Sequence, residues 1–114
     1  MILDTPKPIC IGYLGPPCMT AACRTKNKWR MDLRSLAARE FLTLEDVWEE
    51  RSPKQTTALE NVFGLIAERS ERQENRIEVM IILCDEHLGE SEDARAEVLA
   101  RLENDCVRVL RVWT

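Results

Sequence analysis

The chain has 114 residues, of which 45% are hydrophobic and 32% charged, and its formal net charge is −4 at neutral pH. This length suits one domain, residues 1–114, with a hydrophobic core of its own. The sequence contains no run of about 18 apolar residues and no secretory leader, so we expect a cytoplasmic protein with no membrane partner.

Charge is divided unevenly along the chain. Residues 1–44 carry seven basic and three acidic side chains, whereas residues 45–114 carry nine basic and seventeen acidic ones. This balance disfavours a general nucleic-acid binder, although the basic segment 24–34 permits a local contact with nucleic acid. The acidic part suits docking to a basic partner.

The five cysteines do not form a recognisable framework. Their number is odd, and no pair has the Cys-x-x-Cys spacing of a zinc knuckle. We therefore expect reduced thiols, no metal site and no cofactor. The positions are Cys10, Cys18, Cys23, Cys84 and Cys106.

The first 28 residues show little regular patterning and are expected to form an irregular N-terminal segment. Within it, Pro8–Leu14 can form a short strand, which Gly15 and the two prolines after it end. The helical and strand-helix-strand core is expected in residues 29–114.

Three helices are predicted in the first part of this core. Asp32 can cap a helix that runs to about Phe41, and a short helix follows over Thr43–Trp48. A longer helix is predicted to begin at Pro53, because Ser52 before it is a good capping residue and proline is favoured at the first helical position.

The last 39 residues predict a strand, a helix and a second strand. Ile77–Cys84 is almost continuously apolar and rich in β-branched residues, as in a strand buried on both faces. Ser91 can cap an amphipathic helix that reaches Asn104, where a left-handed residue can end it. Cys106–Trp113 is rich in strand formers, and two such strands joined by a helix are expected to be parallel.

Together these elements predict an α/β fold with a small parallel or mixed sheet of about three strands and flanking helices. An all-α fold is the alternative. Residues from Phe63 to His87 recur in steps of three and four, with the polar Ser70 and Gln73 among them, and so do residues from Leu99 to Trp113, as in a long C-terminal helical hairpin turning at Gly89.

The end of the predicted strand Ile77–Cys84 carries candidate catalytic residues. Open α/β sheets bind ligands beyond the carboxyl ends of their strands, and Asp85, Glu86 and His87 stand there. These side chains can act as a general base or as metal ligands. Alternatively they form an ordinary strand exit, in which case His87 should titrate as an unperturbed imidazole.

A candidate binding segment precedes the predicted core helices. Arg24, Lys26, Lys28 and Arg30 surround Trp29, and cations beside an indole can contact phosphates while the ring stacks on a base. The alternative is a solvated linker in which Trp29 packs under the next helix.

The stretch from Ile77 to Trp113 resembles the C-terminal third of very-short-patch-repair-like endonucleases: an apolar strand ends at Asp85, His87 follows, and a charged helix leads to a second apolar strand. In that family a glutamate stands two residues before the aspartate, where this chain has Leu83. The resemblance therefore implies a relative that has lost catalysis.

The preferred hypothesis is a non-enzymatic interaction domain, such as an inhibitor, an adaptor or an oligomer subunit, that binds another protein or itself. Its acidic surface and the aromatic anchors Trp29, Trp48 and Trp113 would form the contact. Two alternatives remain: a nucleic-acid-associated protein using residues 24–34, or a degenerate endonuclease-like or hydrolase domain using the acidic and histidine residues 85–87.

Overall fold

The computed structural model of the chain describes residues 7–51 and 57–113. Strands and helices alternate in these residues, and the elements are β1 (Ile9–Leu14), α1 (Cys23–Arg39), β2 (Thr43–Glu49), α2 (Thr57–Arg72), β3 (Ile77–Ile82), α3 (Glu92–Asn104) and β4 (Arg108–Arg111). Two short 3-10 helices interrupt this alternation: η1 (Pro16–Thr20) follows β1, and η2 (Asp85–Leu88) follows β3.

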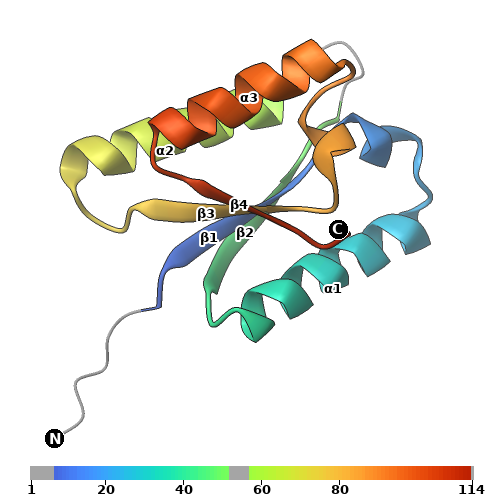
Figure 1. Ribbon diagram of the computed structural model, residues 1–114. Helices are drawn as coiled ribbons and strands as arrows, with labels where there is room; N and C mark the ends of the chain where they lie inside the picture. Colours follow the sequence, from blue (N-terminus) through green and yellow to red (C-terminus); the bar gives the residue numbers. More distant parts are fainter. Residues whose placement is uncertain (1–6, 52–56, 114) are drawn as a thin grey trace, which may run out of the picture.

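The four strands form one sheet in the order β2-β1-β3-β4, and every neighbouring pair is parallel. Helix α1 lies on one face of this sheet, and α2 and α3 lie side by side on the other (Figure 1). The predicted α/β fold is therefore confirmed, with four strands instead of about three. The all-α alternative is excluded, because β3 and β4 occupy the two arms of the proposed helical hairpin.

The core has two layers, one on each face of the sheet. Under α2 and α3 it contains Phe63 and Met80, and under α1 it contains Leu33 and Ile81. All residues of β3 from Val79 to Ile82 are fully buried. Burial on both faces explains the continuous apolar run of these residues, whereas Glu78 near the start of the strand is exposed. None of the described helices is long and apolar enough to cross a membrane.

The C-terminal strand-helix-strand prediction is confirmed, including its parallel pairing. Ser91 caps α3, since its Oγ accepts a hydrogen bond from the Ala94 N–H at 3.1 Å. One detail was wrong. The left-handed residue beyond this helix is Cys106, with φ of 59°, and Asn104 is still helical.

The predicted short helix Thr43–Trp48 was wrong, because these residues form strand β2 beside β1. Two glutamates of this strand pair with cations from other elements. Glu45 pairs with Arg69 of α2, and Glu49 pairs with Arg30 of α1.

Helix α1 starts at Cys23, well before the predicted cap at Asp32, which pairs with Lys28 inside the helix at 3.3 Å. The segment 1–28 is therefore less irregular than expected: its described residues include the predicted strand, η1 and the first turns of α1. The cap of α1 is Ala22, which makes no side-chain hydrogen bond, and the buried residues of the helix are Leu33, Leu36 and Ala37 in its second half. The predicted helix start at Pro53 lies outside the described residues.

Candidate functional site at the carboxyl edge of the sheet

The carboxyl ends of the four parallel strands meet at one edge of the sheet. The chain leaves β1 through α1 toward β2, and it leaves β3 through α3 on the opposite face toward β4. The strand order therefore reverses between β1 and β3. In open α/β sheets ligands bind in the crevice at such a switch point. In this protein η1 and η2 meet there (Figure 1).

His87 occupies this switch point as a buried, neutral ring. It is 1% exposed, and its Nδ1 accepts a hydrogen bond from the Gly15 N–H at 2.9 Å. An imidazole that accepts at Nδ1 carries its proton on Nε2. Burial lowers the pKa of His87 below its usual 6.5, although the charge of Glu86 acts in the opposite direction. The imidazole is therefore not the unperturbed one expected of an exposed strand exit.

Gly15 allows the two segments to approach this closely. A Cβ atom at this position would lie 1.7 Å from the carbonyl oxygen of His87, far inside van der Waals contact. The backbone of the β1 exit thus lies directly against the backbone of η2, and only glycine fits. Atoms of both segments therefore occupy the part of the switch point between β1 and β3.

Two indoles extend this closed region toward the surface. The ring of Trp29 meets His87 edge to face at a centroid distance of 5.5 Å, and it meets Trp113 at 6.0 Å in a similar arrangement. Trp29 is half-buried, whereas Trp113 is 47% exposed. The carboxyl edge therefore ends in an exposed aromatic side chain that is held from below by a second one.

The predicted catalytic residues do not converge on one point. Asp85 forms an ion pair with Arg111 of β4, Glu86 is exposed, and His87 faces the interior. Within residues 7–51 and 57–113, no group of three histidine, cysteine or acidic side chains is placed to hold a metal ion. Asp85 fastens η2 to the edge strand instead.

A second polar cluster at the same edge involves Glu50, which the sequence analysis did not single out. The side chain is 3% exposed and accepts from the Tyr13 hydroxyl at 2.7 Å and from the backbone N–H groups of Ala58 and Leu59 at 3.0 Å each. The carboxylate thus caps the first turn of α2. Burial and the adjacent carboxylate raise the pKa of Tyr13.

The nearby thiol of Cys18 is not activated as a nucleophile. Its Sγ donates weakly to the carbonyl oxygens of Glu50 at 3.4 Å and Leu14 at 3.6 Å. Burial, more than any other cause, raises the pKa of this thiol above its ordinary value. A reactive cysteine needs the opposite shift, because the thiolate is the attacking species.

The predicted basic segment forms the first half of α1, and its cations serve different contacts. Arg30 pairs with Glu49, and Lys28 pairs with Asp32. Arg24 and Lys26 make no ion pair with any residue that the structure describes, and Trp29 belongs to the aromatic contact with His87. A joint binding role for the five side chains remains a prediction.

No protein-family model and no curated protein matches the sequence. Among solved structures, the fold is similar to that of the C-terminal catalytic domain of ISC1926 TnpA, an IS607-like serine recombinase. The TM-score is 0.71 with 14% sequence identity, and the match covers 92% of this chain and 70% of that chain. At this level of identity the likeness is one of fold.

We predict opposite effects for alanine at two glycines. Gly15→Ala should destabilise the protein by about 3 kcal/mol or more, because its Cβ would overlap the His87 backbone. Gly64→Ala should stabilise it by about 0.5–1 kcal/mol, because the site is exposed on α2 and has free space around it. Urea unfolding measures both, and a well-tolerated Gly15→Ala would contradict the close approach.

The neutral state of His87 should make stability depend on pH. Its folded pKa lies below the unfolded value of about 6.5, so the unfolded chain takes up the proton first as the pH falls. The stability that the neutral ring contributes is complete above about pH 6.5 and is lost as the pH falls toward the folded pKa.

The comparison variant is His87→Asn, which does not titrate and keeps an acceptor for the Gly15 N–H. The difference in unfolding free energy between the unmodified protein and this variant should shrink between about pH 7 and pH 5.5. Imidazole resonances in NMR should give a midpoint below that of a histidine peptide. A midpoint at or above the peptide value would refute the buried neutral ring.

Proposed function

We propose that this chain is a non-catalytic domain of recombinase-like fold that binds another protein at the carboxyl edge of its sheet. The observation that carries the proposal is the closed switch point. His87 and Gly15 occupy the crevice in which an α/β enzyme holds its substrate. A domain in which this crevice is occupied by its own residues can bind other molecules through its outer surface.

The distribution of polar groups at the edge supports a role without catalysis. The Glu50 carboxylate accepts three hydrogen bonds, Asp85 is ion-paired, and the ring nitrogen Nδ1 of His87 is occupied. A general base must reach a substrate proton through a free lone pair. These groups instead hold β1, β2, α2 and η2 together, which argues against the hydrolase alternative.

The exposed indole of Trp113 is the best anchor for a protein partner. It is 47% exposed, and its edge-to-face contact with Trp29 limits its motion before binding. Tryptophan is enriched among the side chains that dominate binding energy at protein interfaces, and a pre-ordered side chain loses less entropy there. For such a partner, this domain would act as an adaptor, an inhibitor or a subunit of the same assembly.

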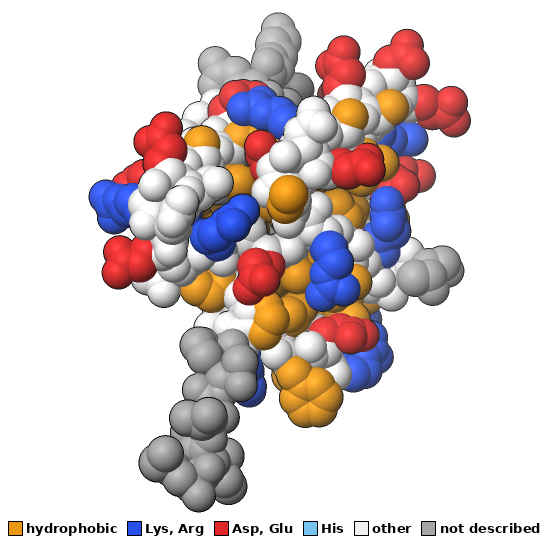
Figure 2. All heavy atoms as spheres, turned by 60° about the vertical axis from the view of Figure 1, so that its left-hand side comes forward, with side chains coloured by type: hydrophobic (Ala, Val, Ile, Leu, Met, Phe, Trp, Pro, Cys, Tyr) orange, Lys and Arg blue, Asp and Glu red, His pale blue; other side chains and the backbone are white. Residues whose placement is uncertain are grey.

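Association with nucleic acid is the second candidate. Two observations favour it: the similar solved structure is a recombinase domain, and Arg24 and Lys26 on α1 are free of ion pairs among the described residues. Figure 2 shows acidic and basic side chains interspersed over one face of the molecule, with apolar side chains between them. That face lacks the continuous basic surface of a nucleic-acid binder.

Site-specific photo-crosslinking in the source cell tests the proposal. The crosslinking amino acid benzoylphenylalanine replaces Trp113 in one variant and Phe41 in the other. Phe41 is a suitable control because it is 73% exposed but follows the C-terminal end of α1, away from the indoles. We expect a discrete protein adduct from position 113 and none from position 41.

The adduct should resist nuclease. In a lysate of the same cells it should form equally well after the salt concentration is raised, because an interface built on an indole depends little on counterions. Adducts that nuclease removes would favour the nucleic-acid alternative. Equal adducts from both positions, or none from position 113, would contradict a protein interface at this edge.

A further inference from the structure

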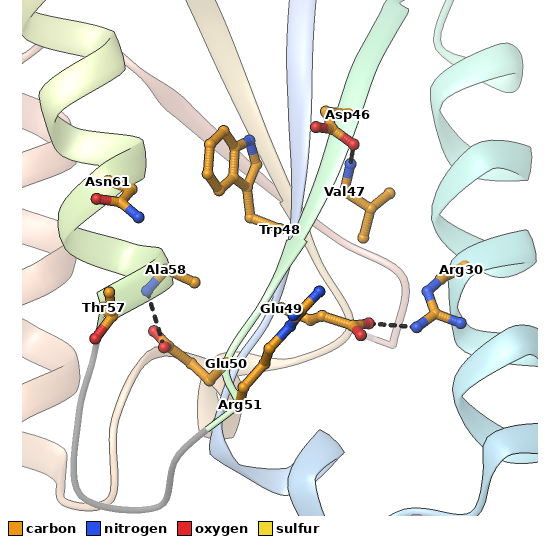
Figure 3. A pocket seen from close by; sticks show the side chains of 10 residues that line it. All are labelled: Arg30, Asp46, Val47, Trp48, Glu49, Glu50, Arg51, Thr57, Ala58 and Asn61. Atoms are coloured by element: carbon orange, nitrogen blue, oxygen red, sulfur yellow. Dashed lines mark hydrogen bonds and ion pairs between the residues drawn. The ribbon is translucent and has the colours of Figure 1, made fainter.

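The sheet has two outer strands, β2 and β4, and the chain itself already occupies the outer side of β2. The Val47 N–H donates to Oδ1 of Asp46 at 2.8 Å, and Arg30 of α1 reaches Glu49 in an ion pair (Figure 3). A backbone donor that has its own partner offers little to an incoming strand. The β4 edge is therefore the more open of the two.

Strand β4 directs backbone donors and acceptors outward. Val112 donates its N–H to the Ile82 carbonyl oxygen at 2.9 Å, so this residue faces β3. Because the direction of the peptide groups alternates along a strand, Val109 and Arg111 point their N–H and C=O groups away from β3. Neither N–H has a hydrogen-bond partner within residues 7–51 and 57–113. Figure 1 shows β4 in front of the other strands, between α3 and α1.

Apolar side chains lie beside these outward groups. Leu110 and Val112 are on the α1 face, where a single helix covers the sheet, and both are only partly buried. Val109 is partly buried on the opposite face. The exposed indole of Trp113 continues this surface to the carboxyl edge. A strand that pairs with β4 would therefore cover backbone donors and apolar side chains together.

The sequence of β4 is complementary to itself. If two β4 strands pair antiparallel about a twofold axis at Leu110, this residue lies opposite its own copy. Val109 then lies opposite Arg111, and Arg108 lies opposite Val112. The outward N–H and C=O groups of Val109 and Arg111 meet as hydrogen-bonded pairs. No arginine stands directly opposite another arginine, which would be unfavourable.

Charge also distinguishes this register from its neighbour. With the axis at Leu110, the two Arg111 side chains are diagonal neighbours about 7–8 Å apart, but each is neutralised by the Asp85 of its own chain. An axis at Val109 would instead make diagonal neighbours of the two exposed Arg108 side chains. Helix α3, which packs beside β4, adds net negative charge to each copy, so salt should not weaken the association.

We propose that β4 pairs antiparallel with β4 of a second copy of this chain, about a twofold axis at Leu110, so that the sheets of the two copies become continuous. This pairing rests on the protein-binding role proposed above and names the partner, because the surface of Trp113 continues into the β4 edge. The rival occupant is an extended segment of a different protein.

Disulfide trapping in the purified protein tests the register. In Leu110→Cys the two thiols would belong to a non-hydrogen-bonded pair with Cα atoms about 4.5 Å apart, which suits a disulfide. In the control Val112→Cys, the thiols would lie at least about 13 Å apart along the strands. Oxidation should give a covalent dimer from position 110 and none from position 112. Both variants carry serine at the three cysteines that are not buried: Cys23→Ser, Cys84→Ser and Cys106→Ser.

Sedimentation equilibrium measures the association itself. Val109→Pro removes an outward N–H and leaves the pairing with β3 intact, because an edge strand accepts proline where its N–H faces solvent. It should weaken dimerisation about tenfold or more, since each dimer loses two hydrogen bonds. The matched control Val109→Ala keeps the N–H and should weaken dimerisation less. If Val109→Pro does not fold, the trapping result decides.

Three results would overturn the second copy as partner: a monomer at millimolar concentration, equal trapping at positions 110 and 112, or a dimer that Val109→Pro leaves unchanged. The proposed function can survive such a result. A purified monomer together with a crosslink from position 113 to a different protein would refute the dimer and keep the protein-binding role. A monomer with no crosslink from position 113 would refute both.

Discussion

The hydrogen bond from the Gly15 N–H to His87 Nδ1 joins segments that are 72 residues apart in the sequence. It forms where the strand order reverses, and it requires glycine on one side and a neutral ring on the other. Trp29 packs against this ring, and Trp113 packs against Trp29. The Gly15–His87 hydrogen bond is therefore connected to the exposed indole of Trp113 through Trp29. Loss of this hydrogen bond should disorder the Trp113 side chain.

Glu50 joins neighbouring elements in a similar way at the carboxyl end of β2. It receives the Tyr13 hydroxyl from β1 and two backbone donors from α2, so one carboxylate connects three elements. A buried polar cluster stabilises a unique arrangement when all its members are hydrogen-bonded. Residue types that often serve catalysis thus hold secondary-structure elements together here.

The sequence predicted those elements whose signals are local. Ser91 caps a helix through a residue three positions away, and β3 is apolar from Val79 to Ile82, where it is buried on both faces. Strand β2 was misjudged because Glu45 finds its cation, Arg69, 24 residues later. The place of residues 85–87 at the carboxyl edge followed from parallel strands, but their roles depend on partners that are remote in the sequence and visible only in the fold.

Hydrogen exchange at the Gly15 amide tests the closed edge most directly. If His87 holds this N–H in the native state, its exchange should be as slow as that of the buried β3 amides, such as that of Ile81, and should require opening of the whole sheet. The exchange rate of an unstructured peptide at Gly15, with β3 still protected, would show that the crevice opens in the folded protein. That result would contradict a non-catalytic domain whose switch point is filled.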